Sequence, residues 1–145
     1  MEHYSVDGYQ SYRSVGHLVR RAHVRCVNEL GPALAILGLT HVQLGILISL
    51  RDRVAQSPKD LRSQMSHDSG ALSRALDQLE TRGWVRRHRR ATDRRSVELQ
   101  LTDAGQAMVE GALPILVGKL NSALRRFTRQ EVGEFVRLLQ KFIEA

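Results

Sequence analysis

The sequence predicts a mainly α-helical chain with one small β-hairpin. Apolar residues recur three and four positions apart through most of its 145 residues, as they do on one face of a helix. In a single segment the period changes to two, where Val97, Leu99 and Leu101 alternate with polar residues. Capping residues and glycines separate the helical segments. The length corresponds to about one domain.

The N-terminal part divides into a polar start and a long helix. Residues 1–10 are polar and are expected to form a flexible N-terminus. Residues 11–36 carry an apolar stripe and predict a helix, which the pair Gly31-Pro32 could interrupt. Gly38 is suited to the left-handed position after a helix end.

Three shorter helices are expected next. Thr40 is a good N-cap for a densely apolar helix. Ser57 followed by Pro58 places proline at the first position of a short helix. Asp68 can cap a further helix, which ends at Gly83.

The alternating segment needs a partner strand, and residues 84–89 supply it through a polar loop at residues 91–95. Thr102 then caps a helix that runs to about residue 126 and could bend near Pro114. Thr128 to Glu131 is a capping-box pattern that opens the last helix. Its apolar face is formed by Val132, Phe135, Val136, Leu139 and Phe142.

This order of elements is that of a winged helix-turn-helix. The lobe covers residues 38–102, with flanking helices in residues 11–37 and 103–145. The flanking helices carry apolar stripes that a chain of this length cannot easily cover alone. We therefore expect them to be dimerisation helices, which pack against a second copy of the chain.

The positive charge of the chain is concentrated in the hairpin. The formal net charge is +7 and the pI is near 10.5. Residues 82–95 hold seven arginines and one acid, Asp93, and so contribute +6 within fourteen residues. Such a short basic element favours nucleic acid over a membrane surface as the partner. The longest apolar stretch, residues 44–50, is also far shorter than the roughly 20 residues that span a bilayer.

Several functional classes lack support in the sequence. A lone Cys26 excludes an internal disulfide and a cysteine-based zinc site within one chain. The six histidines show no metal-ligand spacing, and no glycine-rich phosphate loop or nucleophile elbow is present. We expect no enzymatic activity, no cofactor and no metal. The N-terminus lacks the pattern of a signal peptide, so the cytoplasm is the expected compartment.

Two elements are expected to face DNA. In the helix that ends at residue 82, the stripe of Leu72, Ala75, Leu76 and Leu79 is expected to be buried. The opposite side holds the candidate DNA-binding residues Ser69, Gly70, Ser73, Arg74 and Asp77. Arg74 has the donor geometry for a guanine, whereas the alternative is a solvated helix face.

The hairpin supplies further candidates, since arginines gain from the negative potential of a minor groove. They are Arg87, Arg89, Arg90, Asp93, Arg94 and Arg95, with the carboxylate expected to orient a neighbouring arginine. The alternative is a solvated charge run. Thr40 and Lys59, at two helix N-termini, are candidates for phosphate contact, although ordinary capping also explains their positions.

These residues resemble the MarR family (multiple antibiotic resistance regulators). The similarity lies in residues 76–87 (LDQLETRGWVRR), 93–97 (DRRSV) and 101–105 (LTDAG), and also in 39–44 (LTHVQL) and 68–74 (DSGALSR). It extends from about residue 11 to the C-terminus. The wing loop departs from the family in lacking the glycine or proline often found there.

The resemblance implies a homodimer on a pseudo-palindromic operator, with one recognition helix in each half-site. It implies that Arg94 enters the minor groove and that Asp93 orients the loop. Most members are repressors, released by small phenolic or other lipophilic anions or by cysteine oxidation. The ligand cleft usually lies where the dimerisation helices meet the DNA-binding lobe.

The signal that the chain senses has several candidates. His17, Arg21 and His41 are polar groups near the junction of the first two helices and are candidates for ligand binding. Cys26, near several arginines, is the candidate for a thiol-oxidation sensor, although a buried cysteine is usually inert. A nonspecific architectural DNA-binding protein remains the rival to a regulator, because basic charge alone would serve it.

Overall fold

The computed structural model describes residues 2–65, 69–90 and 93–144, and of residues 90 and 93–95 it describes the backbone only. The prediction of a mainly helical chain with one β-hairpin is confirmed. The elements are η1 (Ser11–Arg13), α1 (Val15–Ile36), α2 (His41–Arg51), α3 (Pro58–Gln64), α4 (Ser69–Thr81), β1 (Val85–Arg90), β2 (Asp93–Leu101), α5 (Asp103–Ala123) and α6 (Arg129–Glu144).

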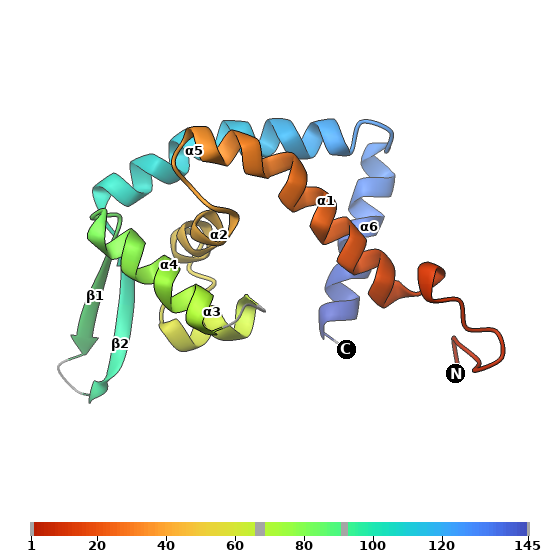
Figure 1. Ribbon diagram of the computed structural model, residues 1–145, viewed down its shortest axis with the longest axis horizontal. Helices are drawn as coiled ribbons and strands as arrows, with labels where there is room; N and C mark the ends of the chain where they lie inside the picture. The colour runs from red at the N-terminus through yellow and green to blue at the C-terminus, as the bar shows by residue number, and fades with distance from the viewer. Residues whose placement is uncertain (1, 66–68, 91–92, 145) are drawn as a thin grey trace.

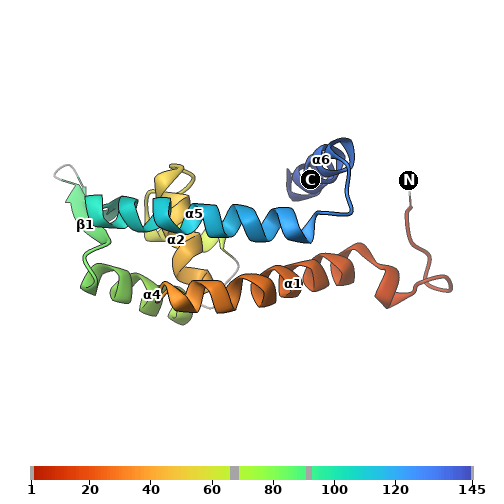
Figure 2. The same ribbon diagram turned by 90° about the horizontal axis from the view of Figure 1, so that it is seen from above.

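The molecule is elongated, with a lobe at one end and α6 at the other (Figure 1). The long helices α1 and α5 run side by side and connect the two ends, as the view from above also shows (Figure 2). The lobe consists of α2, α3, α4 and the hairpin, and both chain termini lie near the far end. The helix-turn-helix and its wing therefore lie at one end of the molecule, and α6 lies at the other end.

The helix starts predicted at Thr40, Ser57, Thr102 and Thr128 are confirmed, whereas the first helix begins at Val15, after a short 3-10 turn, and not at residue 11. The Thr40 hydroxyl accepts from the Gln43 backbone N–H at 3.1 Å, and the Gln43 side chain accepts from the Thr40 backbone N–H at 3.0 Å. Thr128 and Glu131 form the same reciprocal pair at the start of α6, and the Ser57 hydroxyl accepts from the Asp60 N–H at the start of α3. The cap predicted at Asp68 lies outside the described residues.

Two glycines stop helices as expected, whereas the interruption considered at Gly31-Pro32 does not occur. Gly38 and Gly83 have φ values of +69° and +73°, the left-handed region that lacks a penalty only for glycine. α1 continues through Pro32, because the Leu30 and Leu34 side chains flanking it are buried in the core and outweigh one lost backbone hydrogen bond. α5 likewise runs unbroken through Pro114 and ends at Ala123, earlier than expected.

The hairpin is longer than predicted. β1 and β2 are antiparallel, with Val85 opposite Leu101 and Arg87 opposite Leu99. β2 begins at residue 93, so residues 93–95 of the expected loop belong to the strand, whereas residues 91 and 92 lie outside the described residues. The Leu99 backbone N–H also donates to the Gln56 carbonyl at 2.8 Å, which fixes the hairpin to the segment before α3.

The core occupies the lobe and the adjoining halves of α1 and α5. The buried leucines, isoleucine, valines and alanines come from Leu30 and Leu34 of α1 through to Val109 and Ala112 of α5. The stripe predicted for α4, namely Leu72, Ala75, Leu76 and Leu79, is buried as expected. Burial of this apolar surface stabilises the lobe as one unit.

The far end of the molecule exposes apolar side chains instead. α6 buries none of its residues, and its Phe135, Phe142 and Ile143 are 42%, 56% and 79% exposed. Within the described part of the chain, no single helix is long and apolar enough to cross a membrane. The bent pair α1 and α2 meets that test only together, by length and composition.

Candidate nucleic-acid interface

Helix α4 presents a polar face beside the basic hairpin. Ser69, Ser73, Arg74 and Asp77 are exposed and Gly70 is half-buried, which matches the face predicted from the helical period. Small residues at the N-terminal end of this helix allow the close approach that a major groove requires.

Two polar contacts join α4 and the residue that follows it to α2 and to the segment before α2. The amide of Gln43, which is only 2% exposed, donates to the Gln78 side chain at 2.7 Å. The Arg82 guanidinium donates to the Gly38 carbonyl and lies 5.0 Å from the centre of the Trp84 ring. A buried polar side chain is stable only when it is hydrogen-bonded, so the Gln43–Gln78 pair fixes how α4 sits on α2. Sequence analysis did not select Gln43, whose only signal was its place in the Thr40 cap.

The base of the wing is fastened to α5 by the motif Thr102 to Gly105. The Thr102 hydroxyl accepts from the Gly105 N–H at 3.1 Å and donates to the Gly83 carbonyl. The Thr102 N–H donates to the Trp84 carbonyl at 3.1 Å. At Gly105 a Cβ atom would lie 2.1 Å from that same carbonyl oxygen, so only glycine permits α5 to approach the strand so closely. The Leu-Thr-x-x-Gly pattern of residues 101–105 thus serves to pack α5 against the hairpin.

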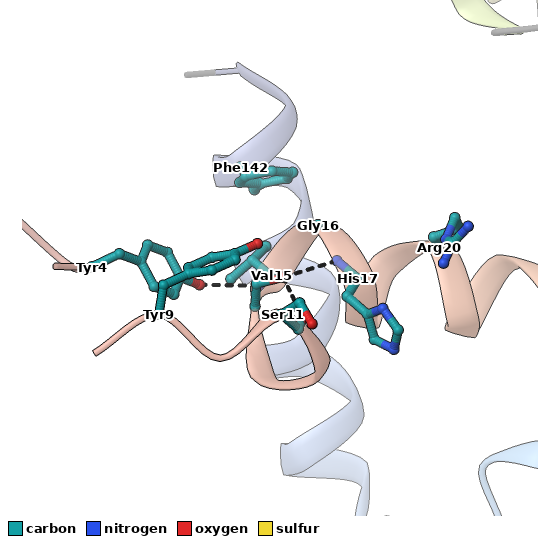
Figure 3. Close-up of a pocket in the computed structure, with 9 residues that line it drawn as sticks. Tyr4, Tyr9, Ser11, Val15, Gly16, His17, Arg20 and Phe142 are labelled. Atoms are coloured by element: carbon teal, nitrogen blue, oxygen red, sulfur yellow. Dashed lines mark hydrogen bonds between the residues drawn. The ribbon is translucent and has the colours of Figure 1, made fainter. Parts of the chain in front are cut away.

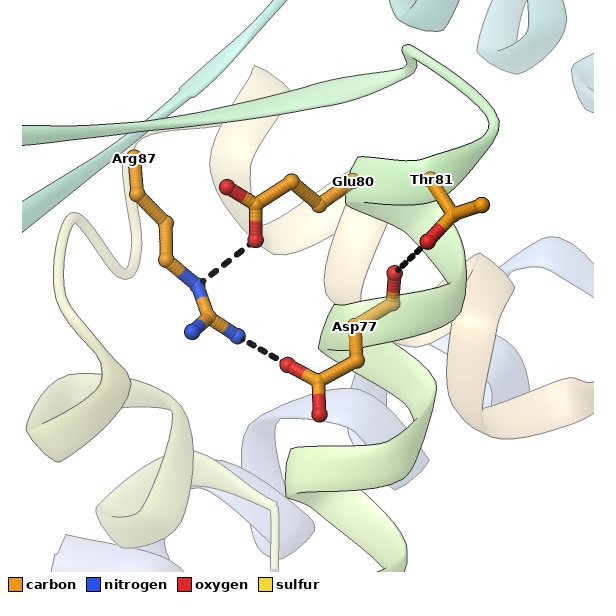
Figure 4. Close-up of polar contacts among 4 residues, drawn as sticks. All are labelled: Asp77, Glu80, Thr81 and Arg87. Carbon is orange, nitrogen blue, oxygen red and sulfur yellow. Dashed lines mark hydrogen bonds and ion pairs between the residues drawn. The ribbon is translucent and has the colours of Figure 1, made fainter.

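Of the arginines predicted to face DNA, Arg87 is described with both its partners (Figure 4). Its Nη2 atom lies 2.6 Å from Asp77 Oδ1, and its Nε atom lies 3.1 Å from Glu80 Oε2. Arg89 is exposed on the same strand. The side chains of Arg90, Asp93, Arg94 and Arg95 lie outside the described residues, so their contacts with DNA stay a prediction.

A small hollow of about 110 Å³ opens between α3, α4 and β1. Its lining includes Arg62, Ser69, Ser73 and Arg87. Arg62 was missed by sequence analysis, because the pattern of a seven-residue helix does not reveal which of its side chains turn toward α4.

The two predicted phosphate contacts lie in different surroundings. Thr40 uses its hydroxyl and its N–H within the cap of α2, near the C-terminal half of α4. Lys59 is exposed on α3. The neighbouring Asp60 accepts from the Gln56 backbone N–H at 2.9 Å, and this bond, aided by the Ser57 hydroxyl, holds the pKa of Asp60 below its ordinary value. The carboxylate of Asp60 therefore holds Gln56, whose carbonyl in turn accepts from the Leu99 N–H of the hairpin.

The three candidate ligand-binding residues do not line one common pocket. His17 lines a hollow of about 540 Å³ with Tyr4, Tyr9, Arg20 and others (Figure 3). Its wall is built by the N-terminal segment, in which the Tyr4 hydroxyl accepts from the Val15 N–H at 3.0 Å. Phe142 of α6 closes the other side.

Arg21 lines a different hollow, formed along α1. His41 lies at the start of α2 with its ring 5.9 Å from that of His23. Cys26 is half-buried on α1. Among the described residues, no group of three or more histidine, cysteine or acidic side chains is placed to hold a metal ion.

Comparison with known proteins shows which family has this sequence and fold. A model described as MarR family matches residues 39–97. The multiple antibiotic resistance protein MarR of Escherichia coli is 34% identical over 128 residues, which make up 88% of this chain and 87% of that protein. MarR of Salmonella typhimurium is 31% identical over 94% of this chain and 96% of its own length.

Solved structures agree with the sequence relatives. A cysteine-to-serine mutant of E. coli MarR complexed with operator DNA gives a TM-score of 0.75 at 32% identity, covering 88% of this chain and 92% of that one. BpsR of Bordetella bronchiseptica, solved in a study of how 6-hydroxynicotinic acid regulates its DNA binding, gives 0.81 at 30% identity, with 94% and 98% covered. The fold and its exposed basic hairpin define a winged helix-turn-helix protein. The chain belongs to the MarR family.

Proposed function

We propose that the chain is a homodimeric, sequence-specific transcriptional repressor of the cytoplasm, released from its operator by a small aromatic or lipophilic anion. The observation that carries the proposal is the exposed face of α4, with Ser69, Ser73 and Arg74, beside an arginine-rich hairpin. A helix and a wing with these side chains fit adjacent major and minor grooves. E. coli MarR, a relative with the same fold, is known in complex with operator DNA.

The bare apolar face of α6 supports the dimer. An isolated amphipathic helix with phenylalanines exposed is unfavourable in water, and a second copy supplies the matching face. Exposed apolar residues also follow α1 and α5 toward the same end, including Val15, Leu18 and Val117. Two copies joined there would present two α4 helices to a pseudo-palindromic site.

The expected result of a binding experiment is strong sequence preference. An operator selected from a random duplex pool should bind at least about 10³-fold more tightly than unselected DNA at physiological salt. This ratio is measured by fluorescence anisotropy with both duplexes across a salt series. Nearly equal affinities with a steep salt slope would instead identify an architectural DNA-binding protein.

The effector is tested with the operator complex. Aromatic carboxylates are expected to weaken operator binding and to raise the melting temperature of the free protein, since a ligand at a hundred times its Kd stabilises by about 2.7 kcal/mol. Alanine variants of His17, Arg21 and His41 identify which of these side chains takes part. A Cys26→Ser variant should still respond to the acids. Thiol sensing would be favoured instead if only peroxide released the parent protein from the operator and the Cys26→Ser variant no longer responded to peroxide.

A further inference from the structure

The polar contacts of Arg87 give it a different role from its neighbours in the hairpin. Successive side chains of a strand point to opposite faces. Val85, Arg87 and Arg89 share the face whose cross-strand neighbours Leu101, Leu99 and Val97 are buried or half-buried against the core. Arg87 therefore points inward, toward α4, and does not follow the outer surface of the wing.

On that side the Arg87 guanidinium meets two carboxylates one helical turn apart. Asp77 and Glu80 stand three positions apart on α4, so their side chains lie on one face of the helix. Asp77 accepts a hydrogen bond from Nη2 of Arg87 at 2.6 Å, and Glu80 forms an ion pair with Nε at 3.1 Å (Figure 4). A guanidinium held by two carboxylates at two of its nitrogens has a defined direction.

The charges of this group oppose a direct contact with DNA. One guanidinium beside two carboxylates leaves the three side chains with a net charge of −1. A phosphate that approached Arg87 would also approach Asp77 and Glu80, which repel it. Arg89, two residues further along the same strand, is exposed near the wing tip and is placed better for a phosphate.

We propose that Arg87 is a positioning residue that fixes the wing relative to the recognition helix, with Asp77 and Glu80 as its ion-pair partners. The inference rests on the proposed function. A two-stranded hairpin is marginally stable alone, so its direction depends on what holds it. The Leu99–Gln56 and Thr102–Gly83 hydrogen bonds hold β2 and the base of the wing, and Arg87 holds β1 to the face of α4.

Loss of the Arg87 ion pairs is expected to weaken DNA binding more than it lowers the free energy of unfolding. The side chains of Arg87, Asp77 and Glu80 are 36%, 61% and 43% exposed, and ion pairs at such sites contribute little to stability. Simultaneous contact of α4 and the wing with two grooves depends on their relative direction. A loose wing would lose that simultaneous contact while the protein remains folded.

The test compares Arg87→Ala, the double variant Asp77→Asn with Glu80→Gln, and the triple variant that combines them. Operator and random-sequence duplexes are titrated with each protein over a range of salt concentrations. We expect Arg87→Ala and the double variant each to weaken operator binding about tenfold, and the triple variant to lose no more than Arg87→Ala, because all three remove one coupled contact. The double variant should nevertheless bind random DNA more tightly, since it removes two negative charges from the DNA-facing side.

Arg89→Ala is the matched control. It should lower the slope of log affinity against log salt by about one for each phosphate contact removed, whereas Arg87→Ala should keep the parent slope. Thermal melts by circular dichroism establish that every variant is folded at the assay temperature.

Two outcomes would overturn the inference alone. A lower salt slope for Arg87→Ala, together with tighter operator binding by the double variant, would show that Arg87 contacts phosphate. A loss in the double variant that disappears when one operator base pair is changed would show that one of its two carboxylates reads a base. If the parent protein itself shows no operator preference, the proposed function fails first, and the inference with it.

Discussion

A Gly105→Ala variant is expected to lose about 3 kcal/mol or more of its free energy of unfolding, because the added methyl group has no space. The new Cβ would lie 2.1 Å from the Trp84 carbonyl oxygen and 3.1 Å from a methyl group of Leu101. The carbonyl is backbone and already accepts from the Thr102 N–H, so it cannot turn away without breaking that bond. Helix α5 would have to move off the hairpin.

Such a loss is a large part of the roughly 5–15 kcal/mol that stabilises a typical domain. Urea unfolding followed by circular dichroism measures it. Gly111→Ala is the matched control, since it lies on the same helix and its Cβ would meet nothing within 4 Å. At that position alanine should stabilise by about 0.5–1 kcal/mol through its higher helix propensity. Equal effects of the two substitutions would contradict the packing role of Gly105.

Local signals in the sequence predicted the elements well because they act within a few residues. The caps at Thr40, Ser57, Thr102 and Thr128 depend on a side chain and the N–H three residues later, and all four are present. Gly38 and Gly83 end helices for an equally local reason. The helical period was sufficient to separate the buried and exposed faces of α4.

Contacts between distant segments were not predicted, and they decide the geometry of the candidate site. Gln43 meets Gln78 across 35 positions, and Arg87 meets Asp77 across ten. Nothing in the spacing of these residues specifies the pairs, because the packing of α2, α4 and β1 brings them together. For this reason Asp77 and Arg87 were both assigned to DNA contact from the sequence, whereas the structure joins them to each other.

The candidate effector residues show the same limitation. His17, Arg21 and His41 were grouped because they flank one helix junction in the sequence. In the structure His17 lies in the hollow near α6, and His41 lies against His23 at the start of α2. His17 lies near the start of α1, and at 1.5 Å for each residue roughly 28 Å of helix separates it from the junction with α2.

Replacing Phe135 and Phe142 together by glutamate is expected to convert the dimer into a monomer that has lost operator binding. These are the two phenylalanines of α6, and both lie on its exposed apolar face. Four carboxylates placed in the interface of two copies would lack partners, and burying an unpaired charge is far costlier than leaving it in water. Analytical ultracentrifugation should then show the mass of a single chain, 16.4 kDa.

Because a monomer engages one half-site at a time, the affinity for the full operator should fall at least about 100-fold. Lys141→Glu is the control, since it lies beside Phe142 on the opposite, polar face of α6 and changes the charge of each chain by the same two units. It should remain dimeric. Arg94→Ala separates the two functions in the other direction, as it should weaken operator binding and leave the mass of the dimer unchanged. A Phe135→Glu, Phe142→Glu protein that kept both its mass and its operator affinity would show that α6 is not the dimer contact.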